Sequence, residues 1–492
     1  MTRRAPPLEI ISRHTTTEPP VHRPIRRWTG LVLPALLTTL LLAAGGCHSL
    51  PDVELARTLP VSRSKIPVDI ESRDGMVNRA ARVRLTRTLA TTGDTALLDY
   101  HLAAMNEIGA PPLLLDNAVE LLIDGPRTYR AVFAAIESAR DYVLVESFIF
   151  EEAVEGDRRL SALLAEARQR GVAVYVIYDA VGSLTTDQEF LKRLGDAGVA
   201  LCAFNPLNPL DQRFAGLNHR DHRKIVVVDG ERAYAGGINF SNAYRIASRQ
   251  LKKGGFSKQK AIEQGWRDTH IGVRGPAARH LEDLFRDTWA RAECPGTIEP
   301  APNEAAIDGG QTVVQVVAST PDDEHNVIYA TLLSVLAYAQ KSVDVTMAYF
   351  VPDDTLEKAL KDAARRGVAV RIILPAYSDF SGVFYAGRAH YDDLLESGVR
   401  LYELDSAFLH SKSIVVDGVW SSVGSTNFDW RSFVHNNEIS VCVIDEGFAR
   451  SMARMFDDDL RESREITLAQ WKKRGIKERL KELMWLPLQY WL

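Results

Sequence analysis

The sequence predicts an α/β protein made of two tandem domains, each a sandwich of a mixed sheet flanked by helices, related by pseudo-twofold symmetry. From residue 117 onward, apolar strand-like runs alternate with amphipathic helical runs, which is typical of such folds. The order then recurs. Ala167-Arg-Gln-Arg-Gly-Val-Ala-Val returns as Ala363-Ala-Arg-Arg-Gly-Val-Ala-Val, and a His-x-Lys segment at His222 returns at His410. A repeat of about 190 residues indicates a duplicated domain and not a solenoid unit.

The bulk composition is that of a folded protein with an acidic body. The 492 residues suffice for two or three domains, and 46% of them are apolar and 25% charged. The formal net charge is -5, although residues 1–46 carry six arginines against two acidic residues. A nonspecific nucleic-acid binder is normally basic, so no nucleic-acid partner is expected.

Changes of composition along the chain predict its organisation. We expect a signal or membrane-targeting segment (1–46), an N-terminal extension (47–116), a first domain (117–295), a linker (296–310), a second domain (311–460) and a basic amphipathic tail (461–492).

The N-terminal segment resembles a bacterial lipoprotein signal. Arg26-Arg27 precede an apolar run, Leu31–Ala44, that is shorter than the roughly 18 to 20 residues needed to span a bilayer. Small residues and Cys47 follow, a pattern in which the cysteine becomes the lipidated N-terminus after cleavage. An uncleaved anchor is the alternative. We expect a membrane-associated protein of the bacterial cell envelope, lipid-anchored through Cys47 and facing the periplasm.

The remaining cysteines are few and scattered. No Cys-x-x-Cys pair occurs, so a structural zinc site is not expected. Cys202 and Cys442 lie in apolar strand-like runs and are expected to be buried thiols, without a disulfide framework.

The elements of the extension and the first domain follow from periodicity and turn residues. Gly93 separates two predicted helices of the extension, and Gly171 provides a helix stop. The predicted helices are Arg79–Ala90, Thr95–Glu107, Arg127–Arg140 and Arg158–Arg170, and the predicted strands are Val119–Ile123, Tyr142–Phe150 and Val172–Tyr178.

The two His-x-Lys segments are the candidate functional sequences. In the first, His222 and Lys224 begin a strand that runs through Val228, so their side chains share one face. Asp229-Gly230 is a hairpin turn signal, and Gly236-Gly237-Ile-Asn239 follows the returning strand. The second copy repeats this with His410, Lys412, Asp417-Gly418 and Gly424-Ser425-Thr-Asn427.

Each residue taken singly has an ordinary structural interpretation. A lone histidine at a strand start is more often structural than catalytic, a nearby lysine is usually a solvated charge, and Asp-Gly is usually only a turn. Two copies with the same spacing inside a duplicated domain make that interpretation improbable. We therefore predict that the two segments meet in one active site.

The residue types suit a phosphodiester substrate. One histidine attacks phosphorus as a neutral imidazole, and the other donates a proton to the leaving alkoxide and then accepts one from the incoming hydroxyl. No carboxylate cluster at the motifs calls for Mg²⁺, so neither metal nor cofactor is expected. The groups predicted to bind or support the phosphate are Lys224, Lys412, Asn239, Asn427, Ser425 and Gly237.

Each histidine also needs a carboxylate on its second ring nitrogen to fix its tautomer. Glu438 is the candidate partner for His410, and Asp268 is the candidate partner for His222. Asp229 and Asp417 are counted with the catalytic residues, although they also serve the turns.

These motifs resemble the phospholipase D superfamily, and within it the bacterial cardiolipin synthases. The resemblance rests on Asn218-His-Arg-Asp-His-Arg-Lys-Ile-Val-Val-Val-Asp-Gly, Met347-Ala-Tyr-Phe-Val-Pro-Asp-Asp and Gly424-Ser-Thr-Asn-Phe-Asp-Trp-Arg-Ser-Phe. It implies two phospholipase D-like domains and metal-independent phosphatidyl transfer, in which one phosphatidylglycerol forms a phosphatidyl-histidine and a second accepts the phosphatidyl group, giving cardiolipin and glycerol. A phospholipid substrate and a membrane surface are the implied partners.

Three other functions remain open from the sequence. A phospholipase D that transfers to water would share every catalytic residue. A phosphodiesterase or nuclease of the superfamily fits the acidic body less well, and an inactive lipid-binding scaffold fits the intact motifs poorly. The tail, rich in Lys and Arg with Trp and Tyr near its end, suits either an anionic membrane interface or packing on the body.

Overall fold

The computed structural model describes residues 68–206, 218–253, 258–298, 310–321, 323 and 326–491. All of them belong to one compact unit, Leu50–Leu492. The predicted signal segment, Cys47 and most of the predicted linker lie outside the described residues. The boundaries proposed for the two domains stay a prediction.

The described part of the extension begins with a β-hairpin and two helices. Strands β1 (Ile70–Ser72) and β2 (Gly75–Met76) precede α3 (Arg79–Ala90) and α4 (Leu97–Glu107). Gly93 lies between the helices in the left-handed region, at φ 81°. Both predicted helices are therefore present, the second beginning two residues later than expected.

The first half contains a seven-stranded mixed sheet. Its strands lie in the order β8-β7-β4-β10-β11-β13-β3, parallel from β8 to β4 and antiparallel thereafter. The strands are β3 (Leu113–Ile123), β4 (Tyr142–Ser147), β7 (Ala173–Asp179), β8 (Ala200–Phe204), β10 (Ile225–Val228), β11 (Arg232–Gly236) and β13 (Thr269–Arg274). The helices are α5 (Asp124–Glu137), α6 (Leu160–Gln169), α7 (Gln188–Asp196), α8 (Ser248–Lys253), α9 (Lys258–Gln264) and α10 (Pro276–Arg291).

The second half repeats this order strand for strand, as β17-β16-β15-β19-β20-β21-β14. The strands are β14 (Thr312–Ser319), β15 (Ser342–Met347), β16 (Ala369–Pro375), β17 (Arg400–Leu404), β19 (Lys412–Val416), β20 (Trp420–Gly424) and β21 (Asn436–Ile444). The helices are α11 (Val327–Tyr338), α12 (Asp354–Arg365), α13 (Ser381–Ala389), α14 (Tyr391–Glu396), α15 (Trp430–Val434) and α16 (Glu446–Arg461).

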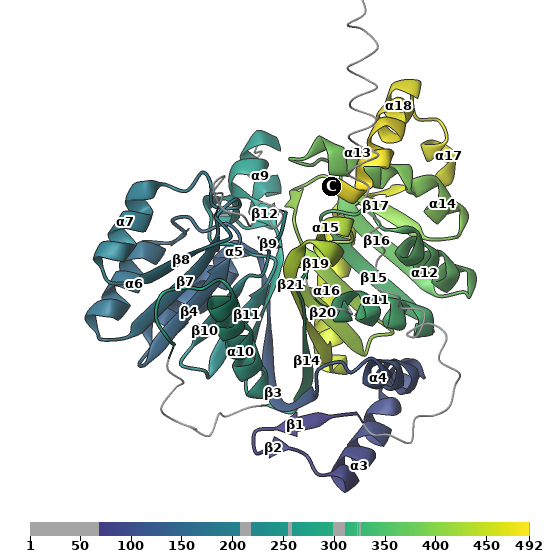
Figure 1. Cartoon of the computed structure of the whole chain (residues 1–492). Helices are drawn as coiled ribbons and strands as arrows, with labels where there is room; N and C mark the ends of the chain where they lie inside the picture. The colour runs from purple at the N-terminus through teal and green to yellow at the C-terminus, as the bar shows by residue number, and fades with distance from the viewer. Residues whose placement is uncertain are drawn as a thin grey trace, which may run out of the picture. The chain divides into compact units, whose positions relative to one another are not determined.

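The two sheets are continuous because β3 and β14 pair antiparallel at the junction, where Figure 1 shows them side by side. One apolar cluster, which includes Leu281 of α10 and Met452 of α16, covers a sheet face across this junction. Separate clusters lie under α5 to α7 in the first half and under α4, α11 and α12 in the second. Each half is thus a sheet between two helical layers, as predicted.

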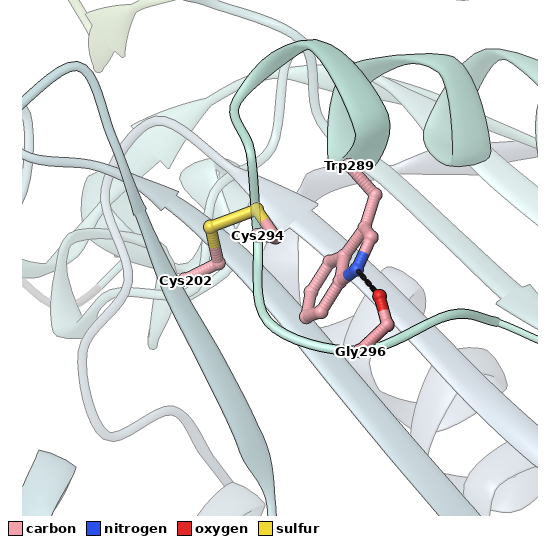
Figure 2. Close-up of a disulfide and its surroundings, with 4 residues drawn as sticks. All are labelled: Cys202, Trp289, Cys294 and Gly296. Atoms are coloured by element: carbon pink, nitrogen blue, oxygen red, sulfur yellow. Dashed lines mark hydrogen bonds between the residues drawn. A yellow bond between two sulfur atoms is a disulfide. The ribbon is translucent and has the colours of Figure 1, made fainter.

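The first half carries a disulfide, which the sequence analysis did not predict. Figure 2 shows Cys202 of β8 joined to Cys294, just after α10. The expectation of a buried thiol is wrong for Cys202 and right for Cys442, which is buried and free. The half-cystines are separated by 92 residues, and only the packing of α10 against the sheet brings their Cα atoms to 5.6 Å.

The first part of the tail, through Trp471, packs as part of the second half. Strand β22 (Ser463–Ile466) pairs antiparallel with β17, and Trp471 at the end of α17 (Leu468–Trp471) is buried. Helix α18 (Ile476–Trp485) packs on α13 and leads into the 3-10 helix η4 (Leu486–Trp491). Among the described helices, none has the length and apolar character needed to cross a membrane.

Candidate active site

Two short strand pairs bring the His-x-Lys segments together across the junction. β9 (Arg220–Asp221), just before His222, pairs parallel with the start of β21 in the other half. In the mirror arrangement, β12 (Trp266–Arg267) pairs parallel with β18 (Phe408–Leu409), just before His410. Backbone bonds then fix both histidines: His222 donates to the carbonyl of Asn437 at 3.0 Å, and His410 donates to that of Arg267 at 2.9 Å.

This pairing places each histidine against a carboxylate of the opposite half. The Nδ1 atom of His222 lies 2.9 and 3.1 Å from the two oxygens of Glu438. The Nδ1 atom of His410 lies 2.7 Å from Oδ2 of Asp268. Both carboxylates act as predicted on a ring nitrogen, but the predicted partners are exchanged. The sequence analysis paired residues within one half, whereas the parallel strand pairs cross the junction.

The histidine–carboxylate contacts fix the tautomer. Burial alone would raise the pKa of Glu438, but His222, Lys224 and the Ser425 hydroxyl together lower it to about 2, so it is ionised at neutral pH. An ionised carboxylate only accepts hydrogen bonds, so Nδ1 of His222 carries the proton and Nε2 keeps its lone pair. The pKa of Asp268 is also lowered despite its burial, chiefly by His410 and Lys412, so the same holds for His410.

Both imidazoles are neutral before substrate arrives. Burial lowers the pKa of each to about 4, against the opposing effect of its carboxylate. A neutral imidazole with a free Nε2 lone pair is the form that attacks phosphorus. An anionic phosphodiester beside the second imidazole would raise its pKa and favour the protonated form needed for a general acid.

The two lysines complete the buried site. Lys224 donates from Nζ to the carbonyl oxygen of His222, and Lys412 donates to that of His410. Burial lowers the pKa of Lys224 to about 7 and that of Lys412 to about 8, although both nearby carboxylates raise them. Burial thus disfavours the ammonium groups, and an anion such as phosphate beside them would stabilise their charge.

In each half of the site, one aromatic ring contacts both the lysine and the histidine. Phe148 lies edge-on to the His222 ring at 5.2 Å, and its face receives Lys224 at 5.3 Å. Tyr349 does the same for His410 at 6.2 Å and Lys412 at 6.0 Å. The sequence analysis did not assign either aromatic residue. Phe150 and Phe350 are the equivalent residues after β4 and β15, so Tyr349 corresponds to Ile149 and not to Phe148. The two rings therefore come from different positions of the repeat, and the repeat alone gave no signal for them.

The glycine and serine of the motifs set the approach of the carboxylates. A Cβ atom on Gly237 would lie 2.1 Å from Oδ1 of Asp268, so this position must be glycine if Asp268 is to reach His410. At the equivalent position of the second half, Ser425 donates a short hydrogen bond to Glu438. The longer glutamate leaves room for that hydroxyl.

Of the two predicted asparagines, Asn239 hydrogen-bonds to other groups of the protein. Asn239 accepts from the backbone N–H of Ile149 at 3.1 Å, and its amide lies 3.4 Å from the hydroxyl of Tyr244. That hydroxyl also lies 3.1 Å from Nδ1 of His410, which makes Tyr244 a further neighbour of the site that the sequence analysis missed. Asn427 is buried as well. A contact of either asparagine with phosphate stays a prediction.

The motif aspartates lie at the opposite ends of their strands. Asp229 accepts three backbone N–H bonds, from Arg140, Asp141 and Tyr142, at 2.9 to 3.0 Å. Asp417 accepts from the backbone of residues 340–342 and from the Thr95 hydroxyl. Both have positive φ, 54° and 53°, as the hairpin turn requires. This geometry places both aspartates in the turns and the loops beneath the strands, and a catalytic role for them stays a prediction.

Within the described ranges, no group of three His, Cys, Asp or Glu side chains is arranged to hold a metal ion. The residues that the structure brings together are two neutral imidazoles, two lysines and two ionised carboxylates. This set can pass a phosphoryl group through one imidazole while the other moves protons.

Comparisons with known proteins agree with this fold and show the family. The family model described as cardiolipin synthase, PLD-like domain, matches residues 132–246 and 332–460. Cardiolipin synthase 2 of Bacillus cereus is 34% identical over 383 residues, covering 77% of this chain and 71% of the relative. Cardiolipin synthase A of Pseudomonas entomophila is 37% identical over 368 residues, covering 74% and 73%.

A solved structure shows the same fold at low identity. The crystal structure of phosphatidylserine synthase from Haemophilus influenzae Rd KW20 is similar with a TM-score of 0.56 and 13% identity, covering 78% of this chain and 99% of that one. Together with the family match, it confirms the predicted fold class of two phospholipase D-like α/β domains.

Proposed function

The chain belongs to the family of cardiolipin synthases with phospholipase D-like domains, and on that premise we propose that it joins two phosphatidylglycerol molecules into cardiolipin and glycerol. The observation that carries the proposal is the crossed pairing of two neutral histidines with ionised carboxylates, beside two lysines in one buried site. Each imidazole presents a free Nε2, so one can bind the phosphatidyl group while the other transfers protons.

In the first step, Nε2 of His222 attacks the phosphorus of one phosphatidylglycerol. The P–O bond to the glycerol headgroup breaks, and the protonated His410 gives its proton to the departing oxygen, releasing glycerol. Lys224 and Lys412 stabilise the negative charge on the two non-bridging oxygens. The positive charge that develops on the His222 ring is stabilised by Glu438 through its Nδ1 proton.

In the second step, the neutral His410 takes the proton from a glycerol hydroxyl of a second phosphatidylglycerol. The resulting oxygen attacks phosphorus, the P–N bond breaks, and the lone pair returns to His222. Cardiolipin leaves and His410 is protonated again. His410 is thus the general acid in the first step and the general base in the second, as microscopic reversibility requires.

The assignment of the nucleophile to His222 is supported by how firmly Glu438 is held. Glu438 contacts His222 with both oxygens, and it also accepts from Ser425 and from the amide of Asn436 at 3.1 Å. A buttressed carboxylate keeps the attacking nitrogen at a constant position through the formation and breakage of the P–N bond.

The disulfide supports a location outside the cytoplasm. Disulfides persist in the periplasm and are rare where glutathione and thioredoxin keep thiols reduced. The Cys202–Cys294 bond agrees with the export signal predicted at residues 1–46. We propose that the enzyme is anchored at a bacterial membrane through Cys47 and faces the periplasm.

The test uses the purified full-length protein in detergent with phosphatidylglycerol labelled in its phosphate, in the presence of a chelator. Cardiolipin together with free glycerol supports the proposal, and phosphatidic acid alone would assign the protein to hydrolysis. Rapid denaturation in detergent at neutral to alkaline pH, where a P–N bond is stable, should leave label on the wild-type protein and none on the His222→Asn variant. A strict need for added metal would contradict the site chemistry.

A further inference from the structure

Helix α18 exposes an apolar stripe on the side that faces away from the body. Ile476, Leu480, Leu483 and Met484 are 58% to 74% exposed. Their spacing places them on one face of the helix, and Lys477 follows the first of them on the flank. We call these four residues the tail stripe. Large apolar side chains gathered in this way mark an interaction surface.

The opposite face of α18 ties the helix to the active site. Trp485 and Tyr349 both pack on a small apolar cluster that contains Val351 and Val383 of the second half. Tyr349 is the aromatic residue that stands edge-on to His410. The position of the tail stripe is therefore fixed relative to the catalytic histidine.

Two loop tips add exposed apolar side chains beside the same site. Val181 and Leu184 are exposed in the loop after β7, and that loop touches Phe148, because a Cβ atom on Gly182 would lie 2.3 Å from the Phe148 carbonyl oxygen. Phe148 is the aromatic neighbour of His222. Two successive contacts, of Gly182 with Phe148 and of Phe148 with His222, therefore connect this loop to the catalytic imidazole.

The second half presents the equivalent loop after β16. Phe380 is exposed at its tip, and the adjacent Asp379 accepts from the Tyr349 hydroxyl at 2.8 Å. Figure 1 shows α13, which begins directly after Phe380, at the upper end of the molecule beneath α18. Both halves thus carry an exposed apolar side chain next to the ring that contacts a catalytic histidine.

This distribution is not the usual scatter of exposed apolar residues. Among the described residues nine large apolar side chains are exposed, and only Met76 lies outside the two loop tips, α18 and η4. Basic side chains are also concentrated in the tail. Residues 472–492 carry six basic and two acidic side chains, and Lys477 and Arg479 border the tail stripe on its two sides. A stripe bordered by cations matches an anionic lipid surface, whereas a second copy of the chain would bring like charges together.

We propose that the tail stripe and the two loop tips form one surface that docks on an anionic bilayer and holds the catalytic histidines at the lipid headgroups. The inference rests on the proposed function only in making the docked lipid also the substrate. Insertion of the tail stripe into a bilayer needs no catalytic turnover. An experiment can therefore refute the docking surface without refuting the proposed function, and the reverse.

The first test measures insertion in the full-length protein. A Leu483→Cys variant is labelled with an environment-sensitive fluorophore, and an Arg84→Cys variant on α3, at the lower end in Figure 1, serves as the matched control. We expect a blue shift at position 483 on vesicles of phosphatidylglycerol and phosphatidylcholine, a smaller shift on phosphatidylcholine alone, and none at position 84. The label reports its own surroundings, so an N-terminal anchor does not create the signal.

The second test is kinetic. A Leu480→Glu/Leu483→Glu variant should raise the KM for vesicle phosphatidylglycerol about tenfold or more, while turnover of a short-chain, monomeric phosphatidylglycerol is unchanged. An unshifted label at position 483, or an unchanged vesicle KM in the double variant, would overturn the docking surface. Self-association that the double variant abolishes, without a lipid effect, would assign the stripe to a second copy. Insertion without cardiolipin formation would refute the proposed function alone.

Discussion

The two histidines of the site share a backbone arrangement, a lysine, a carboxylate and an aromatic neighbour, and they differ in the groups that support the carboxylate and surround the ring. His222 is held by Glu438, which Ser425 and Asn436 hold in turn, and it faces Phe148. His410 is held by the shorter Asp268, and Gly237 stands there in the place that Ser425 has beside Glu438. Three aromatic residues surround His410, namely Trp266, Tyr244 and Tyr349. The duplicated domains present one backbone geometry twice, and the difference in polar support is the structural basis for the different roles proposed for the two imidazoles.

The largest expected effect separates the two histidines themselves. His222→Asn and His410→Asn should each lower kcat by about 10⁴-fold or more, because each removes a group that acts in both steps. Only His222→Asn should also abolish covalent labelling by phosphate-labelled substrate. Circular dichroism melts check that both variants are folded. Label retained in His222→Asn and lost in His410→Asn would reverse the assigned roles.

The crossed carboxylates give the next effect. Glu438→Gln and Asp268→Asn should each lower kcat by about 10³- to 10⁴-fold, since the amide no longer fixes the reactive tautomer. Each variant should change the pKa of the histidine in the opposite half. Nitrogen-resolved NMR titration should show that Glu438→Gln alters the pKa of His222 and that Asp268→Asn alters that of His410. A variant that perturbs the histidine of its own half would contradict the pairing.

The disulfide is present in the first half and has no counterpart among the described residues of the second. Closing a loop of 92 residues stabilises the folded protein by about 4 to 5 kcal/mol in the chain-entropy relation. Cys202→Ser or a reducing agent should lower the Tm by several degrees, measured by calorimetry. Cys442→Ser, at the buried free thiol, is the control and should not abolish the response to reductant. Equal melting with and without reductant would argue against the bond.

The pH dependence compares the two lysines. In the free enzyme Lys224, with a pKa of about 7, loses its charge before Lys412, with a pKa of about 8, and the histidines are neutral above about pH 4. A phosphodiester does not titrate in this range. We therefore expect kcat/KM to be greatest near pH 4, where one imidazole is neutral and the other protonated, and to fall as the pH rises, because His410 must then take up a proton when substrate binds. The fall should steepen above about pH 7, where Lys224 loses its charge, and kcat should fall only at higher pH because bound phosphate raises the pKa of His410 and of both lysines. A profile that stays flat from acid to alkaline pH would contradict this account.

The smallest expected effect concerns the hydroxyl group of Tyr349, which Phe148, the aromatic neighbour of the other histidine, lacks. Tyr349→Phe removes the hydrogen bond to the exposed Asp379 and copies Phe148 of the other half. A single neutral-to-charged bond at the surface contributes about 1 kcal/mol, so kcat/KM should fall less than about tenfold. Phe148→Tyr is the reciprocal variant. A loss as large as that of a histidine variant would show that the Tyr349 hydroxyl touches the reacting groups.

Local patterns in the sequence were sufficient for the elements and for most of the site residues. Gly93 separates two helices where expected, and the Asp229-Gly230 and Asp417-Gly418 turns adopt the left-handed backbone that the pair signals. The strand carrying His222 begins later than predicted, at Ile225, because the preceding residues leave the sheet to meet the other half. Tyr244 was missed because nothing local connects it to His410, 166 residues away.

The sequence by itself determined the duplicated α/β domains, the chemistry of the two His-x-Lys segments and the family, because these depend on periodicity, spacing and residue type. Tertiary structure alone decided which carboxylate serves which histidine, that Cys202 joins Cys294, and which face of α18 stays exposed. All three depend on pairing between segments far apart in the chain. The short parallel pairs β9–β21 and β12–β18 cross the junction, and no local propensity records which half a strand will join.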